Sequence, residues 1–266
     1  MFFLSFKVGL ALGAGGAKGY SHVAVIEKLL ENGITFNEVS GSSAGAAVGA
    51  YYCLTGDVRK IVDVTKNMTT REFQRVLQPN LPTQSIFQGA PFEKFLRKHF
   101  LKDSTFADLT IPFKVCAVDI INQEVVYIED GDLAKAVMAS SSIPGLVPPY
   151  EHMGRLFVDG GVMEPVPTKV LLRCGCQKVI AVNLNKYVYA TKREMNVRDI
   201  LTESYGLMMR SMAEKGMEDP NVFEIAPKFY NAPSYHLNFS EVDFNYNAGL
   251  CVMEKEMDNI LTWLKT

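Results

Sequence analysis

The segment EVSGSSAGAAVGA (residues 38–50) joins two kinds of secondary structure within a few residues. Its first residues are typical of a short β-strand, and the alanine-rich run 44–54 predicts a helix. The junction, Gly41-Ser42-Ser43-Ala44-Gly45, has the pattern Gly-x-Ser-x-Gly. In that pattern the central serine lies on a tight turn that exposes its hydroxyl, and the flanking glycines let neighbouring backbone approach. The segment therefore selects Ser43, and not Ser42, as a candidate nucleophile.

A second interpretation of Ser43 stays open from these residues alone. Serine is a common residue at the start of a helix, where it caps free backbone N–H groups on a turn of small residues. The helix that begins at Ala44 would in either case place its N–H groups and the positive end of its dipole beside Ser43.

Outward from this junction, strand-like and helix-like runs alternate along the chain. The expected strands are residues 7–12, 35–40, 113–120, 124–128, 157–161, 178–184 and 222–225, and the expected helices are residues 19–32, 44–54, 57–68, 91–100, 132–141, 168–173, 197–217 and 247–264. Such alternation is typical of an α/β fold built on a mostly parallel sheet. With 266 residues and no internal repeat, we expect a single domain over residues 1–266.

A glycine-rich loop follows the first expected strand, in LALGAGGAKGYSH (residues 10–22). Its glycines are Gly13, Gly15, Gly16 and Gly19. A loop of this kind between a strand and a helix exposes successive backbone N–H groups and makes an anion site. It is neither a Walker A loop nor Gly-x-Gly-x-x-Gly, because Lys18 occupies the sixth position. Lys18 is either a solvated side chain or a cation whose unfavourable place near a helix start is relieved by a negative substrate group.

A carboxylate follows a later strand, in GRLFVDGGVMEPVP (residues 154–167). The apolar strand leads directly to Asp159, and Gly160 and Gly161 come next. Such an aspartate is often only a turn former. It also has the position of a general base directed at Ser43.

Composition excludes several functional classes. The net charge of -2 and the absence of a basic run give no basis for binding nucleic acid. Five cysteines in mostly apolar contexts lack metal-site spacing, so we expect no metal and no cofactor. The N-terminal run MFFLSFKVGLALGAGG has no basic region before its apolar residues, and the chain has no uninterrupted span of about 20 apolar residues. We therefore expect a cytoplasmic protein, in contact with membranes at most transiently; its oligomeric state is not predicted.

The three motifs together resemble the patatin-like phospholipase family. The resemblance rests on a glycine-rich loop (Gly15-Gly16-Ala17-Lys18-Gly19), a Gly-x-Ser-x-Gly elbow (residues 41–45) and a distant Asp-Gly-Gly (residues 159–161), in this order. The stretch MASSSIPGLVPPY (residues 138–150) and the C-terminal region are also similar to the compact bacterial members. Ala14 departs from the pattern, since many members carry glycine there.

The resemblance implies a three-layer α/β/α fold with a nucleophile elbow, and an enzyme that cleaves acyl esters of lipids without a cofactor. In that mechanism Ser43 attacks the ester carbonyl, Asp159 accepts the proton, and an acyl-enzyme forms. Gly15, Gly16 and Ala17 would supply the backbone N–H groups of the oxyanion hole. Water would then release the fatty acid.

Three alternatives remain for the function. A Ser–His–Asp triad would add His236 in the chain order of α/β-hydrolases, although Ser43 follows only two strands. A nucleotide- or phosphate-binding protein would use the glycine loop with Glu38. A weakly catalytic member of the family would serve as a regulatory or scaffold protein.

Two further segments bear on the substrate. The helix 197–217 carries Met208, Met209, Met212 and Met217 with Leu207, which would line an adaptable acyl pocket or else pack in the core. The Gln-, Pro- and Ser-rich stretch 77–89 has the composition of an exposed loop, and we expect it to serve as a lid.

Overall fold

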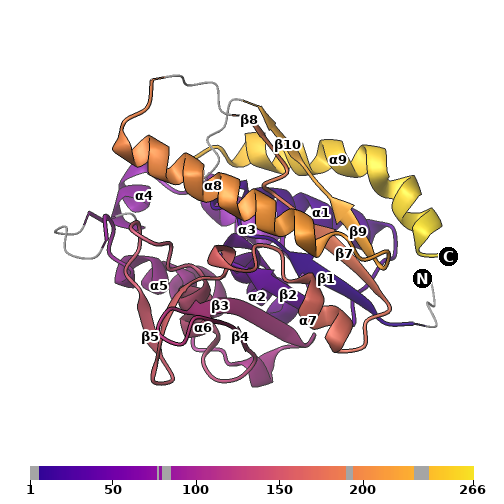
Figure 1. The fold of residues 1–266 in the computed structure, drawn as a ribbon, viewed down its shortest axis with the longest axis horizontal. Helices are drawn as coiled ribbons and strands as arrows, with labels where there is room; N and C mark the ends of the chain where they lie inside the picture. Colours follow the sequence, from indigo (N-terminus) through magenta and orange to yellow (C-terminus); the bar gives the residue numbers. More distant parts are fainter. Residues whose placement is uncertain (1–5, 77, 80–84, 190–193, 231–239) are drawn as a thin grey trace.

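The computed structural model of the chain describes residues 6–76, 78–79, 85–189, 194–230 and 240–266. Its centre is a mostly parallel sheet in which β1 lies between β2 and β7 (Figure 1). The parallel strands, in spatial order, are β3 (Phe113–Asp119), β2 (Glu38–Ser42), β1 (Val8–Leu12), β7 (Lys178–Val182) and β9 (Val222–Ile225). Three antiparallel strands extend the β3 side, namely β4 (Glu124–Ile128), β6 (Arg155–Asp159) and the edge strand β5 (Tyr150–His152).

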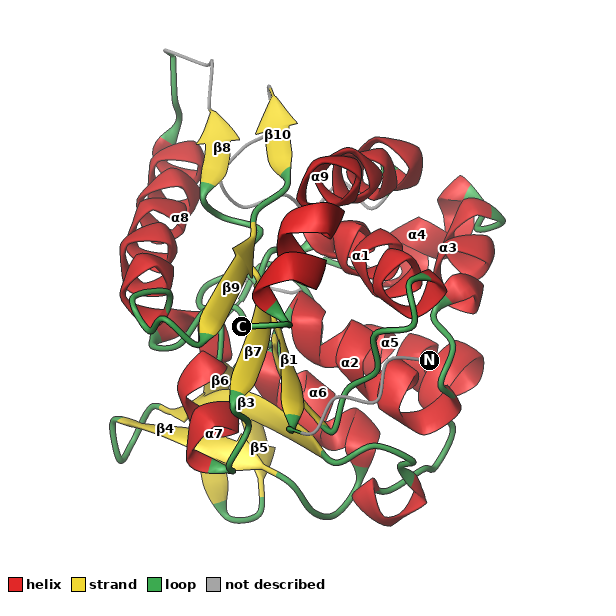
Figure 2. Cartoon of the chain, turned by 90° about the vertical axis from the view of Figure 1, so that its right-hand side faces the viewer, coloured by secondary structure: helices red, strands yellow, loops and turns green. Residues whose placement is uncertain are grey.

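Helices cover both faces of the sheet, as Figure 2 shows. On one face, α2 (Ala44–Thr55) packs on β1, β2 and β3, while α1 (Tyr20–Glu31) packs against α9 (Val242–Trp263). On the other face lie α7 (Thr168–Arg173) and α8 (Val197–Gly216). The expected three-layer α/β/α fold is therefore confirmed.

The remaining elements are short and flank these layers. They are α3 (Arg59–Lys66), α4 (Thr70–Val76), α5 (Ala90–Leu96), the π-helical turn η2 (Arg97–Leu101), α6 (Leu133–Ser140), the 3₁₀ turns η1 (Ala17–Gly19), η3 (Phe106–Asp108) and η4 (Gly160–Val162), and a small sheet of β8 (Tyr187–Tyr189) and β10 (Lys228–Tyr230). No helix among the described residues has the length and apolar character needed to cross a membrane.

The central strands are apolar because they are buried on both faces. Leu10, Leu12, Val39, Ile180 and Val182 have no measurable exposure. Parallel strands covered on both sides carry near-continuous apolar runs, and such runs are the signal for these strands in the sequence. The sheet thus presents the carboxyl ends of β1 and β2 at one edge, where the glycine loop and the Gly-x-Ser-x-Gly turn follow.

Most expected elements agree with the structure within a few residues, and three differences have physical reasons. The second strand is residues 38–42 rather than 35–40, because it continues directly into the turn at Ser43. The last helix begins at Val242, five residues before the expected start, since Val242 is buried and Asn245 O accepts a 2.5 Å hydrogen bond from Ser21 Oγ of α1. The helix expected over 91–100 is α-helical only to Leu96 and continues as a π turn.

Candidate active site

Ser43 occupies the turn between β2 and α2, with φ 54° and ψ −116°. A positive φ is rare for a residue other than glycine and marks backbone strain, which is typical of functional sites. The two flanking glycines are required by space. A Cβ on Gly41 would lie 2.5 Å from Gly45 O, and one on Gly45 would lie 2.0 Å from Leu12 O. The turn can therefore form only with glycine at these two positions, because the backbones of β1, β2 and the start of α2 are too close together for a Cβ atom.

Asp159 lies against Ser43 although 116 residues separate them in the sequence. Ser43 Oγ donates a 2.5 Å hydrogen bond to Asp159 Oδ2, and Gly161 N donates a 2.7 Å bond to Asp159 Oδ1. The strand β6 brings the carboxylate there, because Asp159 pairs with Ala117 of β3, the strand next to β2. Both side chains are almost completely buried. The structure thus brings together the two residues that the sequence motifs selected.

Burial determines the acidity of this carboxyl group. Loss of hydration raises the pKa of Asp159 from 3.8 to about 7, against the opposing effect of the hydrogen bonds from Ser43 and Gly161. A carboxylate with a pKa near neutrality is a far stronger proton acceptor than an ordinary aspartate. The site therefore combines a strained serine with a base whose pKa matches a neutral medium.

Ser140, which the sequence analysis did not single out, holds the nucleophile turn in place. Its Oγ accepts a 2.8 Å hydrogen bond from Ser43 N and donates a 2.6 Å bond to Cys116 O. Ser140 is the last residue of α6 and lies in the stretch MASSSIPG. The only sequence signal for its role is its position, as a small polar residue at the end of an apolar helix. The amide of Ser43 is consequently hydrogen-bonded within the protein and is not available to a ligand.

Replacing Ser140 with alanine is expected to lower the free energy of unfolding by about 2 kcal/mol, because it leaves the buried Ser43 N–H and Cys116 C=O without these partners. Urea denaturation of the variant measures the effect. Ser204→Ala, which removes an exposed serine from α8, is the matched control and should change the value by less than about 0.5 kcal/mol. A Ser140→Ala protein as stable as the control would contradict the bracing role.

The glycine loop faces Ser43 through two of its residues. Gly16, at φ 58°, and Ala17 line the same cavity as Ser43. The loop is fixed at its start, where Gly13 N bonds Val182 O at 3.0 Å and Ala14 N bonds Pro165 O at 2.8 Å. Among the described residues, no backbone carbonyl is recorded as accepting a hydrogen bond from the N–H groups of Gly15, Gly16 or Ala17.

The other motif glycines support the site by close packing. Gly15 packs on Leu184, where an added Cβ would lie 2.7 Å from Leu184 Cδ1, and a Cβ on Gly19 would lie 2.8 Å from that of Ala44. Gly160, the residue after Asp159, packs so closely on β3 that an added Cβ would lie 2.3 Å from Cys116 O. These contacts explain why glycine recurs in all three motifs.

Lys18 is completely buried behind the loop, so its interpretation as a solvated side chain is wrong. Its Nζ donates a 2.9 Å hydrogen bond to Asn185 Oδ1 and lies 5.6 Å from the centroid of the Phe229 ring. Asn185 in turn donates to Ala14 O at 2.8 Å. Burial lowers the pKa of Lys18 to about 7, with a partly opposing effect from Glu203. The side chain is absent from the described lining of the cavity and supports the loop from behind.

The histidine alternative has little support from this geometry. In a Ser–His–Asp triad the imidazole separates the serine from the acid, whereas Ser43 and Asp159 are in direct contact. His22 is buried with Nε2 2.8 Å from Gly13 O, and burial lowers its pKa to about 4. His236, the predicted third member, lies outside the described residues.

Glu38 does not join the glycine loop. It begins β2 and pairs with Gly9 of β1, four residues before Gly13 and so about 13 Å from the loop along the strand. Its carboxylate instead lies 3.5 Å from Lys114 Nζ. A dinucleotide-binding site that pairs this acid with the loop is therefore not formed. Within the described ranges, moreover, no three His, Cys, Asp or Glu side chains are grouped so as to hold a metal ion.

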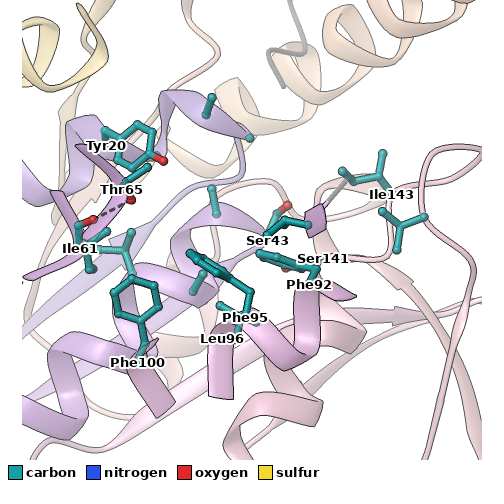
Figure 3. A pocket seen from close by; sticks show the side chains of 18 of the residues that line it. Tyr20, Ser43, Ile61, Thr65, Phe92, Phe95, Leu96, Phe100, Ser141 and Ile143 are labelled. Carbon is teal, nitrogen blue, oxygen red and sulfur yellow. Dashed lines mark hydrogen bonds between the residues drawn. The ribbon is translucent and has the colours of Figure 1, made fainter. Parts of the chain in front are cut away.

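An apolar cavity extends from Ser43 between the helices of one layer (Figure 3). Its described lining is mostly aliphatic and aromatic, and comprises Gly16, Ala17, Gly19, Tyr20, Ser43, Ala44, Ala47, Val48, Tyr51, Ile61, Thr65, Met68, Val76, Phe87, Gln88, Phe92, Phe95, Leu96, Phe100, Ser141, Ile143, Leu146 and Val147. The site can therefore hold an aliphatic chain whose polar end lies at Ser43 and the glycine loop.

The methionine-rich helix α8 is not part of this described lining. Met209 is buried against Ala14, Ile143 and Leu146, whereas Leu207 and Met208 are each 62% exposed. The acyl pocket expected from this helix is thus wrong. Met209 packs in the core, and Met217 packs against a second apolar cluster around Val166, Val170 and Leu171.

The expected lid, residues 77–89, is described only in part, because residues 77 and 80–84 lie outside the described ranges. Its later part lies at the cavity, where Phe87 and Gln88 line the wall and Phe87 N bonds Leu146 O at 2.8 Å. A lid role stays a prediction.

Comparison with known proteins agrees with this geometry. The family model for patatin-like phospholipases matches residues 10–172, which include all three motifs. An uncharacterized NTE family protein of Mycobacterium tuberculosis is 35% identical over 181 residues, covering 67% of this chain and 49% of that protein. Lysophospholipase NTE1 of Cryptococcus neoformans is 32% identical over 181 residues, covering 67% of this chain and 11% of that protein.

The crystal structure of VipD from Legionella pneumophila has a similar fold, with a TM-score of 0.52 at 15% identity, covering 94% of this chain and 67% of that one. The chain spans about half the length of the mycobacterial relatives it matches. The family match extends over most of the chain and takes in the loop, the elbow and the aspartate that the fold brings together. The chain belongs to the patatin-like phospholipase family.

Proposed function

We propose that this protein is a serine acyl hydrolase that cleaves fatty acyl esters of lipids through a Ser43–Asp159 dyad. The observation that carries the proposal is the 2.5 Å contact between Ser43 Oγ and Asp159 Oδ2 at the end of an apolar cavity. Several relatives, among them a lysophospholipase of Cryptococcus neoformans and a neuropathy target esterase of Drosophila melanogaster, bear names that agree with an ester substrate. The whole chain acts as one domain in this proposal and touches a membrane only to collect its lipid.

The first step forms an acyl-enzyme. Asp159 accepts the hydroxyl proton as Ser43 Oγ attacks the ester carbonyl, and the bond to the alcohol breaks after Asp159 returns that proton to the leaving oxygen. The carbonyl oxygen becomes an oxyanion beside the N–H groups of Gly15, Gly16 and Ala17, each worth about 3 kcal/mol if it points at that oxygen. Gly16 and Ala17 are better placed than Gly15 to bind the oxyanion, since both line the cavity.

The second step releases the fatty acid. Water takes the place of the alcohol, Asp159 accepts its proton, and the hydroxide attacks the acyl carbon. Collapse of the tetrahedral intermediate breaks the bond to Ser43 Oγ, which recovers the proton from Asp159. No cofactor or metal enters either step.

Covalent labelling tests the proposal directly. A fluorophosphonate reacts with serines that are activated as nucleophiles, and mass spectrometry locates the adduct. We expect a single adduct on Ser43, slow labelling in Asp159→Asn, and normal labelling in Ser42→Ala. An adduct on another serine would overturn the assignment. Absence of both labelling and turnover of acyl esters would favour the regulatory or scaffold alternative.

The pKa of Asp159 sets a pH dependence for the reaction. Because the ionised carboxylate is the proton acceptor, kcat/KM should rise about tenfold per pH unit in acid solution and reach a plateau above the pKa of about 7. Stopped assays of a soluble p-nitrophenyl ester across this range give the midpoint. Glu164→Gln removes another largely buried carboxyl, whose pKa burial also raises, and should leave the midpoint in place. A profile without an acid limb would contradict the role of Asp159.

A further inference from the structure

One wall of the cavity is a single face of α2. The lining residues Ser43, Ala44, Ala47, Val48 and Tyr51 recur at helical spacing, so this face follows the cavity for two turns. The first two lining residues after Ser43 are Ala44 and Ala47, whose small side chains leave room beside the nucleophile. At 1.5 Å per residue, the path from Ser43 to Tyr51 is about 12 Å, the length of an extended chain of about ten carbons.

The opposite wall is made by α5 and the π-helical turn that continues it. Phe92, Phe95, Leu96 and Phe100 line the cavity from this side. In Figure 3, Phe92 lies near Ser43, and Phe100 lies at the other end beside Ile61 of α3. The two walls therefore run in the same direction away from the nucleophile.

Aromatic rings in mutual contact line the cavity at the end away from Ser43. The rings of Tyr51 and Phe100 meet edge to face with their centroids 5.5 Å apart, and Phe95 meets Phe100 in the same way at 5.7 Å. Thr65 and Ile61 of α3 also line this end, and Thr65 Oγ1 donates to Ile61 O at 2.7 Å, so the polar group of Thr65 is satisfied within α3. An aliphatic chain that enters at Ser43 thus meets the face or edge of Phe100.

The position of Phe100 is fixed by the π turn. Local π-helical turns are rare in proteins, and many of those that occur lie at functional sites. Here Arg97 Nη2 lies 2.9 Å from Glu93 Oε1 and 3.0 Å from Asp132 Oδ1, which ties the turn to α5 and to the start of α6. The turn ends at Lys102, whose φ is 51°. Phe100 is accordingly held on a rigid support.

We propose that Phe100, braced by Tyr51 and Phe95, forms the end wall of the acyl pocket and limits the acyl chain to about ten carbons, the length of two turns of α2. The proposal rests on the proposed function, since it requires Ser43 to receive the acyl group. It adds a specificity-determining residue and a substrate class, esters of medium-chain fatty acids.

A series of p-nitrophenyl esters of increasing acyl length tests the proposal in the full chain. Each methylene that enters the pocket should raise kcat/KM by about threefold to fourfold, and the gain should stop near ten carbons. Each profile is normalised to its own butyryl ester, so that a general loss of activity does not affect its shape. Phe100→Ala should move the optimum to chains longer by about three carbons, and Phe100→Leu should move it by less.

Two further variants make the outcome decisive. Ala47→Leu fills the pocket one turn from Ser43, about 6 Å along α2, and should move the optimum to chains of about five carbons. Phe223→Ala removes a ring that pairs with Trp263 on the opposite edge of the sheet and should keep the wild-type profile. If either Phe100 variant has the wild-type profile, the end wall is not Phe100 and the proposal is overturned.

Failure of the Phe100 proposal can be distinguished from failure of the proposed function. If Ser43→Ala retains ester hydrolysis, the dyad is wrong. If hydrolysis depends on Ser43 but chain length does not depend on Phe100, only the end wall is wrong.

Discussion

Replacing Ser43 with alanine is expected to lower kcat for ester hydrolysis by at least about 10⁴-fold. The variant retains the cavity and the glycine loop but has no atom that can form the acyl-enzyme. Because the change removes one oxygen atom and leaves the glycine contacts that shape the turn, the fold should persist, which circular dichroism and thermal unfolding will check. The residual rate reports what the oxyanion loop and substrate binding supply alone.

Ser42→Ala is the matched control for this loss. Ser42 is the adjacent residue and equally buried, yet its Oγ has no hydrogen-bond partner among the described residues. Its removal should leave kcat within about threefold of the wild type, because surface or buried hydroxyls without a partner contribute little. Equal loss in both variants would indicate a disturbed turn rather than a missing nucleophile. Full activity in Ser43→Ala would remove the dyad altogether.

Replacing Asp159 with asparagine is expected to abolish catalysis, by about 10³-fold or more, and at the same time to stabilise the fold at alkaline pH. The amide has the shape of the carboxyl and can still accept from Gly161 N, but it cannot take a proton from Ser43. The loss of catalysis and the gain in stability have the same cause. Asp159 is a buried ionisable group, and among the described residues no cation offsets its burial.

The sign of the stability effect follows from proton linkage. The pKa of Asp159 is about 7 in the folded protein and about 4 in the unfolded chain. The folded state therefore binds more protons between these values, and the free energy of unfolding falls as the pH rises through this window. At pH 8 the ionised carboxylate destabilises the wild type and the asparagine variant has no such charge, so the variant should be more stable by about 4 kcal/mol, the free-energy equivalent of the pKa difference between the folded and unfolded states. At pH 4 the difference should vanish.

Urea denaturation at both pH values measures this difference, and Asp119→Asn serves as a control of opposite sign. Hydrogen bonds from Asn122 and Ile121 and the charge of Arg155 lower the pKa of Asp119, so its carboxylate stabilises the fold above the unfolded pKa. Asp119→Asn should therefore destabilise the protein at pH 8. An Asp159→Asn protein that is less stable than the wild type at pH 8 would contradict a costly buried carboxylate.

The parts of the site that could be predicted from sequence are those set by local spacing. The elbow at Ser43 and the strand end at Asp159 follow from glycines and apolar runs that lie beside them in the chain. The α/β class with a mostly parallel sheet follows from the alternation of elements, since short connections and right-handed crossovers leave few arrangements of such a sheet. The three-layer arrangement is implied by the family resemblance.

The features that the sequence did not predict are of two kinds. Some depend on contacts with residues far away in the sequence, and others depend on which face of a helix a residue occupies. Ser140 acquires its role from a contact with Ser43 across 97 residues. Lys18 is buried because Asn185 and Phe229 close over it, which no local pattern indicates. Met208 and Met209 are neighbours, yet one is exposed and the other buried, because successive residues of a helix lie about 100° apart.

The placement of the dyad in the sheet has a consequence for inactivation. Ser43 follows a strand inside the sheet, whereas Asp159 ends β6, which has only the three-residue strand β5 between it and the edge. Edge hairpins open at a lower free energy than interior strands, and amide hydrogen exchange records such local opening. We therefore expect the β5–β6 hairpin to move Asp159 away from Ser43 while the rest of the molecule stays folded. If the proposed dyad carries the activity, heating should inactivate the protein through this local opening, before global melting.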